Sequence, residues 1–385
     1  MKSILFDLWQ AQPLAGYKYH GGAEYIKSVY NHLINFFSEE CSITVFFNPA
    51  LFLDEWILES INTHKITIEP IKTKADIQKI LDKTKYDVFY SGLPYMYGTL
   101  RIPTETVFFG TIHGLRSIEF PGDDFAYKYY ASPWASIKSF IKNKIKEFYR
   151  KKNIELLKKG ILNLDNIVCV SNHTKYAIKN FYPLLNKNIE CLYTPQKVCL
   201  SPKIDKPIIN DKYILLINCD RIEKNSYRAI VALEKLFSKR LLEKHKVVTI
   251  GKLPPKIIKT IVHKDKYISY DYVSTESLEG LYANCDIFLY PTLNEGFGMP
   301  PLEAMKYGKT CIVSAICSVP EVCGDAVYYI NPYDINEIQT RILLAIENKI
   351  SEKKITQQLQ LISEKQNSDL HKLCQHITNA YKTFK

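Results

Sequence analysis

Short apolar runs alternate with segments of helical periodicity along the first half of the chain. From Ile26 to Phe37, apolar side chains recur at the three- and four-residue spacing of a helix. Runs of strand length stand before and after this segment. This alternation predicts βα units and a parallel, doubly wound sheet. The predicted strands are residues 4–8, 42–47, 65–69, 87–90, 106–109 and 166–170.

A second series of the same kind follows a looser stretch at residues 190–212, where prolines stand among polar residues. We therefore predict two Rossmann-like domains, at residues 1–195 and 196–365. The end of the chain has a polar helical pattern, and we expect a helix at about residues 366–385 to pack on the first domain. The second series comprises strands at 213–217, 247–250, 268–270, 287–289, 310–313 and 327–330, with helices near 226–238, 277–284 and 302–307.

Size and composition are those of a globular protein. The chain has 385 residues, more than one ordinary core holds, and 46% are hydrophobic while 24% are charged. No apolar run reaches the roughly 20 residues that span a bilayer, and the N-terminus becomes polar too early for a signal peptide. These features predict a cytoplasmic protein. The ten cysteines form no Cys-x-x-Cys pair and are expected to be reduced.

The net charge of +11 is concentrated in part in residues 137–160, which hold nine Lys or Arg and two Glu. Ile137, Phe140 and Ile141 begin an apolar face that continues along the same helical pattern. Two interpretations stay open: a basic amphipathic helix on the inner face of an anionic membrane, or a surface helix with a solvated charged face. Nucleic acid is a poor third candidate, because no binding module accompanies the charge.

Two carboxylates flank a glycine pair late in the chain. Glu295 precedes Gly296 and Gly298, and a Pro-Pro step then opens a predicted helix that contains Glu303. Glycines let the backbone approach a ligand closely, and a helix start favours an anionic group. Carboxylates accept hydrogen bonds from sugar hydroxyls. A phosphate site beside hydroxyl acceptors describes the binding of a sugar nucleotide.

Residues 290–305, YPTLNEGFGMPPLEAM, resemble the signature of the retaining glycosyltransferases of family 4. Residues 281–286 (LYANCD) and 320–326 (PEVCGDA) resemble the neighbouring blocks of that family. Upstream, residues 21–24 (GGAE) and 170–175 (VSNHTK) also fit. The resemblance covers most of the chain and is strongest in its second half. It implies the GT-B fold, an α/β architecture in which the parallel sheets of two Rossmann-like domains face an interdomain cleft.

The resemblance also implies roles for the residues of this signature. Glu295 is expected to contact the transferred sugar, and Glu303 the ribose hydroxyls. The alternative for Glu303 is a favourable acidic residue in a first helical turn. The residues between them are expected to lie beside the sugar and the phosphates; they are Gly296, Phe297, Gly298 and Met299.

Two cations follow the first strand of the second domain. Arg221 and Lys224 can neutralise a diphosphate leaving group, the former as a planar fork and the latter as a point charge. The alternative is a solvated charge pair at a helix start. Asp220 stands where many relatives have glycine, and the lysine lies closer to the arginine than is usual. Tyr272 and Val273 follow another strand and are candidates for contact with the base.

The first domain is less diagnostic. Gly21 and Gly22 lie between the first strand and its helix, where amides can meet a phosphate, or they form an ordinary loop. They do not form a Gly-x-Gly-x-x-Gly fingerprint, which disfavours a nicotinamide enzyme. His113 follows a strand and is implied to lie beside the donor sugar, the alternative being a structural histidine. Arg116 is left open between contact with the acceptor or a phosphate and a surface role.

Together these features predict a retaining glycosyltransferase that moves a hexose-type sugar from a UDP- or GDP-sugar to a glycan or lipid-linked acceptor. No Asp-x-Asp motif is placed to hold a nucleotide-bound metal, and Arg221 with Lys224 can replace one. No cofactor and no metal are therefore expected. Glu295 and Glu303 are not an acid–base pair of a hydrolase, because they are expected at different parts of the donor. The alternatives are a non-catalytic nucleotide-sugar-binding scaffold and a GT-B sugar-nucleotide epimerase.

Overall fold

The computed structural model describes residues 1–13, 20–198 and 209–380. Part of the predicted linker, residues 199–208, and the last five residues of the predicted terminal helix lie outside this range. The chain forms two compact units. Unit 1 consists of Met1–Leu115, Asn153–Leu200 and Ser363–Lys385, and unit 2 of Arg116–Lys152 and Ser201–Ile362.

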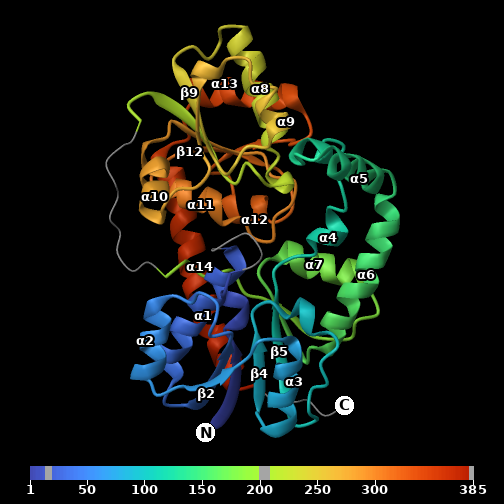
Figure 1. The fold of residues 1–385 in the computed structure, drawn as a ribbon. Coiled ribbons are helices and arrows are strands. Elements are labelled where there is room, and N and C mark those ends of the chain that lie inside the picture. The colour runs from blue at the N-terminus through green and yellow to red at the C-terminus, as the bar shows by residue number, and fades with distance from the viewer. Residues whose placement is uncertain (14–19, 199–208, 381–385) are drawn as a thin grey trace. The chain divides into compact units, whose positions relative to one another are not determined.

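Unit 1 is built on a parallel sheet of seven strands in the order β3-β2-β1-β4-β5-β6-β7. Strands β2, β4 and β5 of this sheet are labelled in Figure 1. The strand order reverses between β1 and β4, as in a doubly wound sheet. All of these strands except β7 were predicted. The pattern did not reveal β7, because it is only three residues long and follows a polar stretch. The strands are β1 (Lys2–Asp7), β2 (Cys41–Phe47), β3 (Thr67–Pro70), β4 (Val88–Ser91), β5 (Val107–Ile112), β6 (Asn166–Cys169) and β7 (Ile189–Cys191).

Helices connect these strands. The first helix, α1, begins at Gly21 because the His20 ring accepts a hydrogen bond from the Ala23 amide, at 3.1 Å. Its apolar stripe packs on the sheet, as the helical periodicity predicted. The helices of this part are α1 (Gly21–Phe37), α2 (Glu55–Thr63), α3 (Lys74–Lys83) and α7 (Asn172–Phe181), with short 3₁₀ turns η1 (Trp9–Ala11) and η2 (Pro94–Tyr97). Helix α6 (Lys146–Asn163) begins in unit 2 and belongs to unit 1 from Asn153 onward.

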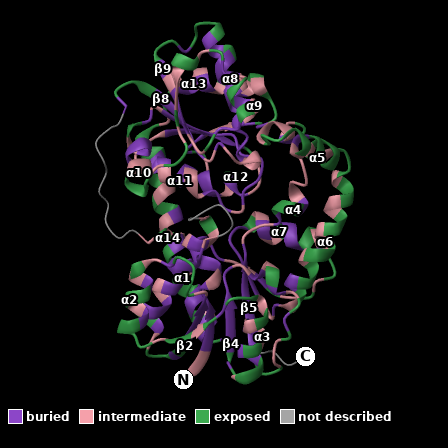
Figure 2. Cartoon of the chain, in the orientation of Figure 1, coloured by how far each residue is buried: buried purple, intermediate pink, exposed green. Residues whose placement is uncertain are grey.

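Unit 2 contains a parallel sheet of six strands in the order β10-β9-β8-β11-β12-β13. The order reverses between β8 and β11, so the two sheets repeat one topology. The strands are largely buried, whereas the outer faces of the helices are exposed (Figure 2). The two-sheet α/β fold predicted from the sequence is therefore confirmed. The strands are β8 (Lys212–Leu216), β9 (His245–Ile250), β10 (Tyr267–Tyr270), β11 (Ile287–Tyr290), β12 (Thr310–Ser314) and β13 (Tyr328–Ile330).

Two helices, α8 and α13, cover one apolar cluster of this sheet. Ile230 and Leu233 of α8 and Ile338 of α13 are fully buried with Ile287 and Ile312 of the strands. The helices of unit 2 are α4 (Arg116–Glu119), α5 (Pro133–Lys144), α8 (Ser226–Ser238), α9 (Pro255–Ile258), α10 (Thr275–Asn284), α11 (Met299–Met305), α12 (Val319–Cys323) and α13 (Ile335–Glu347), with η3 (Ala126–Tyr129), η4 (Ile222–Lys224) and η5 (Lys264–Lys266).

The segment 116–152 belongs to unit 2, although the sequence placed it in the first domain. A buried ion pair joins Asp123 Oδ2 to Arg228 Nη2 at 2.8 Å. The Tyr129 hydroxyl also accepts the Tyr227 amide at 3.1 Å and lies 3.2 Å from Ser226 Oγ. These contacts tie the segment to the start of α8, across about a hundred residues of sequence. A boundary at residue 195 therefore differs from the division into compact units.

The last helix, α14 (Glu352–Thr378), is shared: its residues from Ser363 onward belong to unit 1. There the Asp369 carboxylate accepts the Tyr193 amide at 2.8 Å, and the Gln366 amide donates to Thr194 O at 2.6 Å.

The basic segment 137–160 spans two helices rather than one, because α5 ends at Lys144 and α6 begins at Lys146. Within the described residues, no helix is both long enough and apolar enough to cross a membrane.

Candidate functional site

The site lies at the carboxyl ends of β8 and β11, where the strand order of the second sheet reverses. One loop, residues 217–225, follows β8, and the other, residues 291–298, follows β11. In open parallel sheets, ligands bind at this switch point because the two loops diverge there. Arg221 and Lys224 stand on the first loop and Glu295 on the second. The topology therefore brings Glu295 to Arg221 and Lys224, which stand about seventy positions earlier in the chain.

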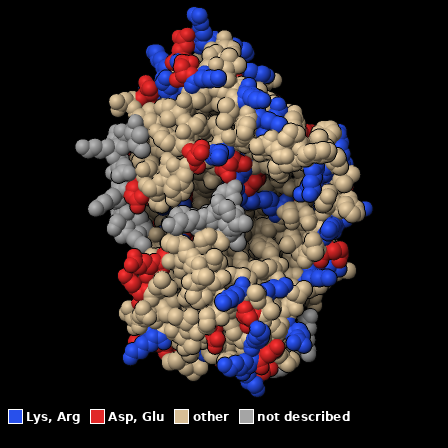
Figure 3. All heavy atoms as spheres, viewed as in Figure 1, with Lys and Arg blue, Asp and Glu red and all other residues tan. Residues whose placement is uncertain are grey.

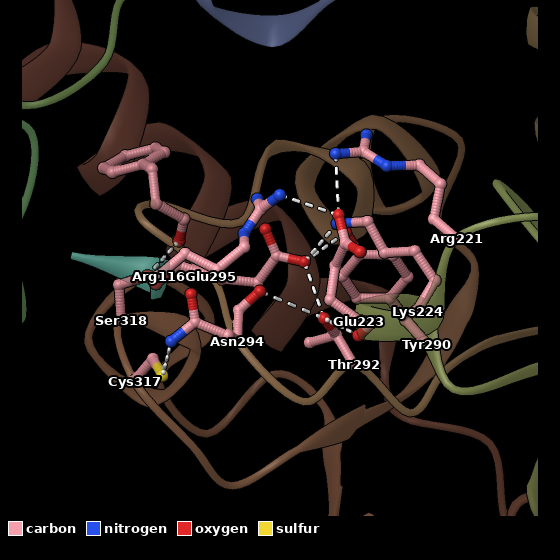
Figure 4. Close-up of polar contacts among 11 residues, drawn as sticks. Arg116, Arg221, Glu223, Lys224, Tyr290, Thr292, Asn294, Glu295, Cys317 and Ser318 are labelled. Atoms are coloured by element: carbon pink, nitrogen blue, oxygen red, sulfur yellow. Dashed lines mark hydrogen bonds and ion pairs between the residues drawn. The ribbon is translucent and has the colours of Figure 1, made fainter. Parts of the chain in front are cut away.

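Lys224 and Glu295 form a buried ion pair. Lys224 Nζ lies 2.5 Å from Glu295 Oε1 and 2.7 Å from the Tyr290 hydroxyl. The same carboxylate oxygen accepts the Tyr290 hydroxyl at 2.6 Å, and Thr292 Oγ1 lies 2.7 Å from it (Figure 4). Both partners of the pair are less than a tenth exposed. One oxygen atom thus accepts a hydrogen bond from each of these three side chains.

The second oxygen of Glu295, Oε2, accepts no hydrogen bond from any described residue. Burial alone raises the pKa of this carboxyl, but the charge and hydrogen bond of Lys224 outweigh it and lower the pKa overall. Glu295 is therefore an ionised carboxylate with one oxygen immobilised and the other available. An available oxygen on such a carboxylate can accept a hydrogen bond from a hydroxyl of a ligand.

Glu223 holds two arginines. Arg116 Nη1 and Arg221 Nη2 each lie 2.7 Å from the same atom, Glu223 Oε1 (Figure 4). Burial raises the pKa of Glu223, but the two guanidinium groups lower it overall. Its main chain is fixed as well, because Glu223 O accepts the Leu293 amide at 2.7 Å. The two loops of the site are thereby joined at Glu223.

Asn225 connects the loop after β8 to the loop after β11 by a hydrogen bond. Its backbone is left-handed, with φ +57°, a conformation that asparagine tolerates better than most residues. Its side-chain amide donates to Pro291 O at 3.0 Å and to Pro332 O at 2.8 Å. On the other side, Ser318 Oγ donates to Phe297 O at 2.9 Å. Both ends of the loop that carries Glu295 are thus held by buried polar groups.

The second predicted carboxylate, Glu303, lies on α11. Its Oε2 accepts the hydroxyl of the buried Tyr282 at 3.0 Å. The helix begins at Met299, and Gly298 before it has φ +103°, a conformation that disfavours any side chain. Gly296, by contrast, has no positive φ. The conformational argument for a glycine therefore applies to Gly298.

Tyr272 and Val273 lie on the loop between β10 and α10, at the edge of the sheet. Tyr272 is largely exposed. No hydrogen bond connects them to the Lys224–Glu295 pair. Their predicted contact with a base stays a prediction.

The remaining candidates lie in unit 1, around the loop after β4. Gly21 and Gly22 form the first turn of α1 rather than a loop before it. A side chain at Gly22 would meet Leu93 at 2.7 Å, whereas the space beside Gly21 is open. Gly22 thus has a packing reason of its own. His113 follows β5, and its Nε2 lies 2.9 Å from Gly92 O on the same β4 loop.

His113 is a neutral imidazole at physiological pH. Burial lowers its pKa to about 4. Because Gly92 O can only accept, the ring carries its proton on Nε2, and Nδ1 is left as an acceptor. The Tyr25 ring packs edge-on against it, with centroids 4.5 Å apart. The His113 ring can therefore accept a hydrogen bond from a ligand through Nδ1, but it does not act as a cation.

Several residues of the site were not singled out from the sequence. Glu223 lies between the two predicted cations, and its charge could have marked it. Tyr290 and Thr292 lie inside the signature segment, where their hydroxyls gave the only signal. Tyr282 is fifty-eight residues from Lys224 in the sequence, and nothing local connects it to Glu303. These residues position the predicted ones.

The sequence of this chain is similar to those of known glycosyltransferases. Residues 202–361 match the family model of the glycosyl transferases group 1. The serotype-specific mannosyltransferase WbdA of Escherichia coli is 32% identical over 145 residues, which are 35% of this chain and 17% of WbdA. The O-antigen chain mannosyltransferase RfbU of Salmonella typhimurium is 27% identical over 192 residues, which are 49% of this chain and 52% of RfbU. The matches thus span only part of these relatives.

Similarity in three dimensions extends over the whole chain. HepE of Anabaena, solved in complex with UDP and glucose, superposes with a TM-score of 0.62 over 98% of each chain at 13% identity. At that identity the likeness concerns the fold. Both sheets of the present chain are included in it. Residues 202–361 are therefore similar to the glycosyl transferases group 1, and the chain as a whole has the GT-B fold.

Proposed function

We propose that this protein is a retaining glycosyltransferase that transfers a hexose from a nucleoside diphosphate sugar to a glycan or lipid-linked acceptor. The main support is the Lys224–Glu295 pair at the switch point of the second sheet, with Arg221 beside it. This arrangement combines an available carboxylate oxygen for a sugar hydroxyl with cations for a diphosphate. The names of WbdA and RfbU favour mannose as the transferred sugar, and GDP-mannose as the first donor to test.

In the proposed reaction, the bond between the anomeric carbon and the diphosphate oxygen breaks, and its electron pair leaves with the phosphate. An acceptor hydroxyl oxygen bonds to the anomeric carbon on the same face. Its proton passes to the leaving phosphate. Arg221 and the third N–H of Lys224 stabilise the developing negative charge. Glu295 Oε2 holds a hydroxyl of the sugar, and Glu303 accepts from the ribose.

We further propose that the reaction needs no metal ion. Arg221 and Lys224 supply the positive charge that a divalent cation provides in other sugar-nucleotide enzymes. The test is transfer activity after dialysis against EDTA, compared with activity after adding back Mg²⁺ or Mn²⁺. Unchanged rates are expected, and dependence on an added metal would contradict this part of the proposal.

A donor panel tests the function itself. The protein is incubated with GDP-mannose, GDP-fucose, UDP-glucose and UDP-galactose, with and without a lipid-linked acceptor, and release of GDP or UDP is measured. Acceptor-dependent release from one donor is expected, and the Glu295→Ala variant serves as the matched inactive control. Nucleotide binding without turnover for every donor would favour the scaffold alternative. Release of a 2-epimer without transfer would favour the epimerase.

The proposal of a lipid-linked acceptor is supported by a second observation: α5 and the start of α6 have an exposed apolar face. Trp134 is 80% exposed and Phe148 is 65% exposed. Lysines lie between these side chains in the sequence, and blue side chains stand beside tan ones on the side of the molecule where α5 and α6 lie (Figure 3). Exposed aromatic groups among lysines fit the interface of an anionic bilayer. The set that we call the α5 surface consists of Trp134, Ile137, Phe140, Ile141, Ile145 and Phe148.

We propose that the α5 surface binds anionic membranes and brings the site to lipid-linked acceptors. The test is flotation with vesicles of phosphatidylcholine alone or with phosphatidylglycerol. Binding only to the anionic vesicles is expected, together with its loss in the Trp134→Ser/Phe140→Ser variant. Val262→Ser, at another exposed apolar residue of unit 2, is the control. Equal binding by wild type and variant, or self-association in place of binding, would contradict the proposal.

A further inference from the structure

Arg116 belongs to the same compact unit as Arg221, although it follows His113 by only three residues. The segment that begins at Arg116 is held on unit 2 by the buried Asp123–Arg228 pair and by Tyr129. The sequence left Arg116 open between an acceptor, a phosphate and the surface. Its place in unit 2 associates it with the residues proposed to bind the donor.

Arg116 and Arg221 converge on a single oxygen atom. Each guanidinium contributes one nitrogen at 2.7 Å to Glu223 Oε1, and neither has another partner among the described residues. The arginine side chains are 45% and 34% exposed, whereas that of Glu223 is 13% exposed. Glu223 thus lies beneath the two cations. Each arginine keeps its other N–H groups for a ligand from solvent.

The exposed part of this cluster carries more positive than negative charge. Lys224 is buried and is paired with Glu295. Above that pair, two guanidinium groups share one carboxylate, and no second carboxylate of the described chain pairs with either of them. Two like charges held this close repel each other, and an anion placed between them relieves the repulsion. The surplus positive charge therefore marks an anion site.

We propose that Arg116 is a further binding residue for the donor diphosphate, and that Glu223 is a positioning residue that holds Arg116 and Arg221 in place for it. This inference rests on the proposed function and deepens it. Guanidinium groups pair with phosphate through two parallel hydrogen bonds, so two of them on one carboxylate match the two phosphates of a diphosphate. Arg116 then contacts the leaving group throughout the reaction.

An acceptor phosphate is the competing ligand, and the arrangement favours the donor. Arg221 and Arg116 share an oxygen atom, so whatever one binds lies within reach of the other. Lys224 follows Glu223 directly in the chain and faces the sugar-binding carboxylate of Glu295. An anion between the two arginines is thus adjacent to the predicted place of the transferred sugar. In a sugar nucleotide, the group adjacent to the sugar is the diphosphate.

The test measures binding of inorganic pyrophosphate, GDP and UDP by calorimetry to wild type, Arg116→Ala and Arg116→Lys. Loss of a charged hydrogen-bonding partner is expected to weaken pyrophosphate and nucleoside diphosphate binding by about tenfold or more. Arg116→Lys recovers part of this, because it keeps the charge without the fork. Binding of guanosine or uridine is expected to be unchanged. Arg101→Ala, at an exposed arginine of unit 1, is the control.

The role of Glu223 is tested by a double-mutant cycle. Glu223→Gln keeps one acceptor oxygen but removes the charge that holds both arginines. It is expected to weaken pyrophosphate binding several-fold in the wild type and less in the Arg116→Ala background. In that background, Arg221 is the only one of the two arginines left for Glu223 to hold. Equal effects in both backgrounds, or tighter binding by Glu223→Gln, would overturn the positioning role.

The outcomes separate this inference from the proposed function. If wild type binds a nucleoside diphosphate and Arg116→Ala binds it equally well, Arg116 is not a diphosphate ligand while the function stands. If Arg116→Ala raises only the KM for the acceptor, the arginine serves the acceptor and the inference is likewise overturned. If wild type binds neither pyrophosphate nor any nucleoside diphosphate, the proposed function falls and this inference with it. Circular dichroism and thermal melting confirm that each variant is folded.

Discussion

At the scale of single residues, the site depends on a carboxylate whose two oxygens have different tasks. Glu295 Oε1 is surrounded by Lys224, Tyr290 and Thr292, while Oε2 has no partner among the described residues. A carboxylate free on both sides would rotate, and ordering it would cost entropy on binding. Here the protein has already ordered it. For the proposed sugar hydroxyl, the position of the accepting oxygen is therefore set before the donor binds.

Glu295→Gln tests this arrangement. The amide has nearly the same shape but no charge, so it is a weaker acceptor for the ligand and leaves the Lys224 ammonium buried without its partner. We expect transfer to fall by about a hundredfold or more and the free energy of unfolding to fall by roughly 3 kcal/mol. Transfer rates and urea unfolding are measured beside Glu347→Gln at an exposed site. Near-normal transfer would remove Glu295 from the site.

His113 provides a test by pH. Burial lowers its pKa in the folded chain to about 4, below the ordinary value of 6.5. Between these values the unfolded chain binds the additional proton, so stability rises with pH and is lost as pH falls from about 6.5 to 4. His113→Asn is expected to remove roughly 2–3 kcal/mol of this pH dependence. Urea unfolding of both proteins from pH 4 to 7.5 measures it, and parallel curves would contradict the shift.

At the scale of elements, the segment 116–152 decides which residues surround the site. It brings Arg116 to Glu223, and it is anchored at the start of α8 by Asp123 and Tyr129. The Arg228 guanidinium lies over the Phe125 ring, with Cζ 4.6 Å from the centroid of the ring. This anchor is a buried charged contact, in which removal of one partner leaves the other without compensation.

Arg228→Ala is expected to destabilise the protein by about 3–5 kcal/mol, because the Asp123 carboxylate is then buried unpaired. Lys354→Ala, which removes the exposed pair with Asp325, is the control and is expected to cost less than about 1 kcal/mol. Chemical denaturation of both variants gives the comparison. Equal losses would show that the segment 116–152 is held by other contacts. Pyrophosphate binding by Arg228→Ala then reports whether Arg116 still reaches Glu223.

At the scale of the whole molecule, two sheets of the same strand order each present loops at their carboxyl ends. The positions of all strands but β7 were predictable because each is a short apolar run between helical segments, and such patterns are local. The signature at residues 290–305 was predictable for the same reason. The return of the last helix to unit 1 was expected, whereas the transfer of residues 116–152 to unit 2 was not, because no local pattern marks it.

Ligand binding by the folded molecule has a thermodynamic consequence. A nucleoside diphosphate at about one hundred times its Kd stabilises the protein by roughly 2.7 kcal/mol. We expect GDP or UDP to raise the melting temperature of wild type, and the same concentration to raise that of Arg221→Ala far less. Differential scanning fluorimetry at fixed protein concentration measures both. An equal shift in the two proteins would show that Arg221 takes no part in nucleotide binding.

The amino-acid sequence by itself determined the alternation of strands and helices, the parallel sheets and the residue types of the site. It did so because strand and helix periodicities and the Glu295 signature are properties of neighbouring residues. The tertiary structure alone decided that Glu223 holds Arg116 and Arg221, that Tyr282 meets Glu303, and that Gly22 packs on Leu93. These contacts join residues far apart in the chain, and only folding brings their charges, hydroxyls and surfaces within bonding distance.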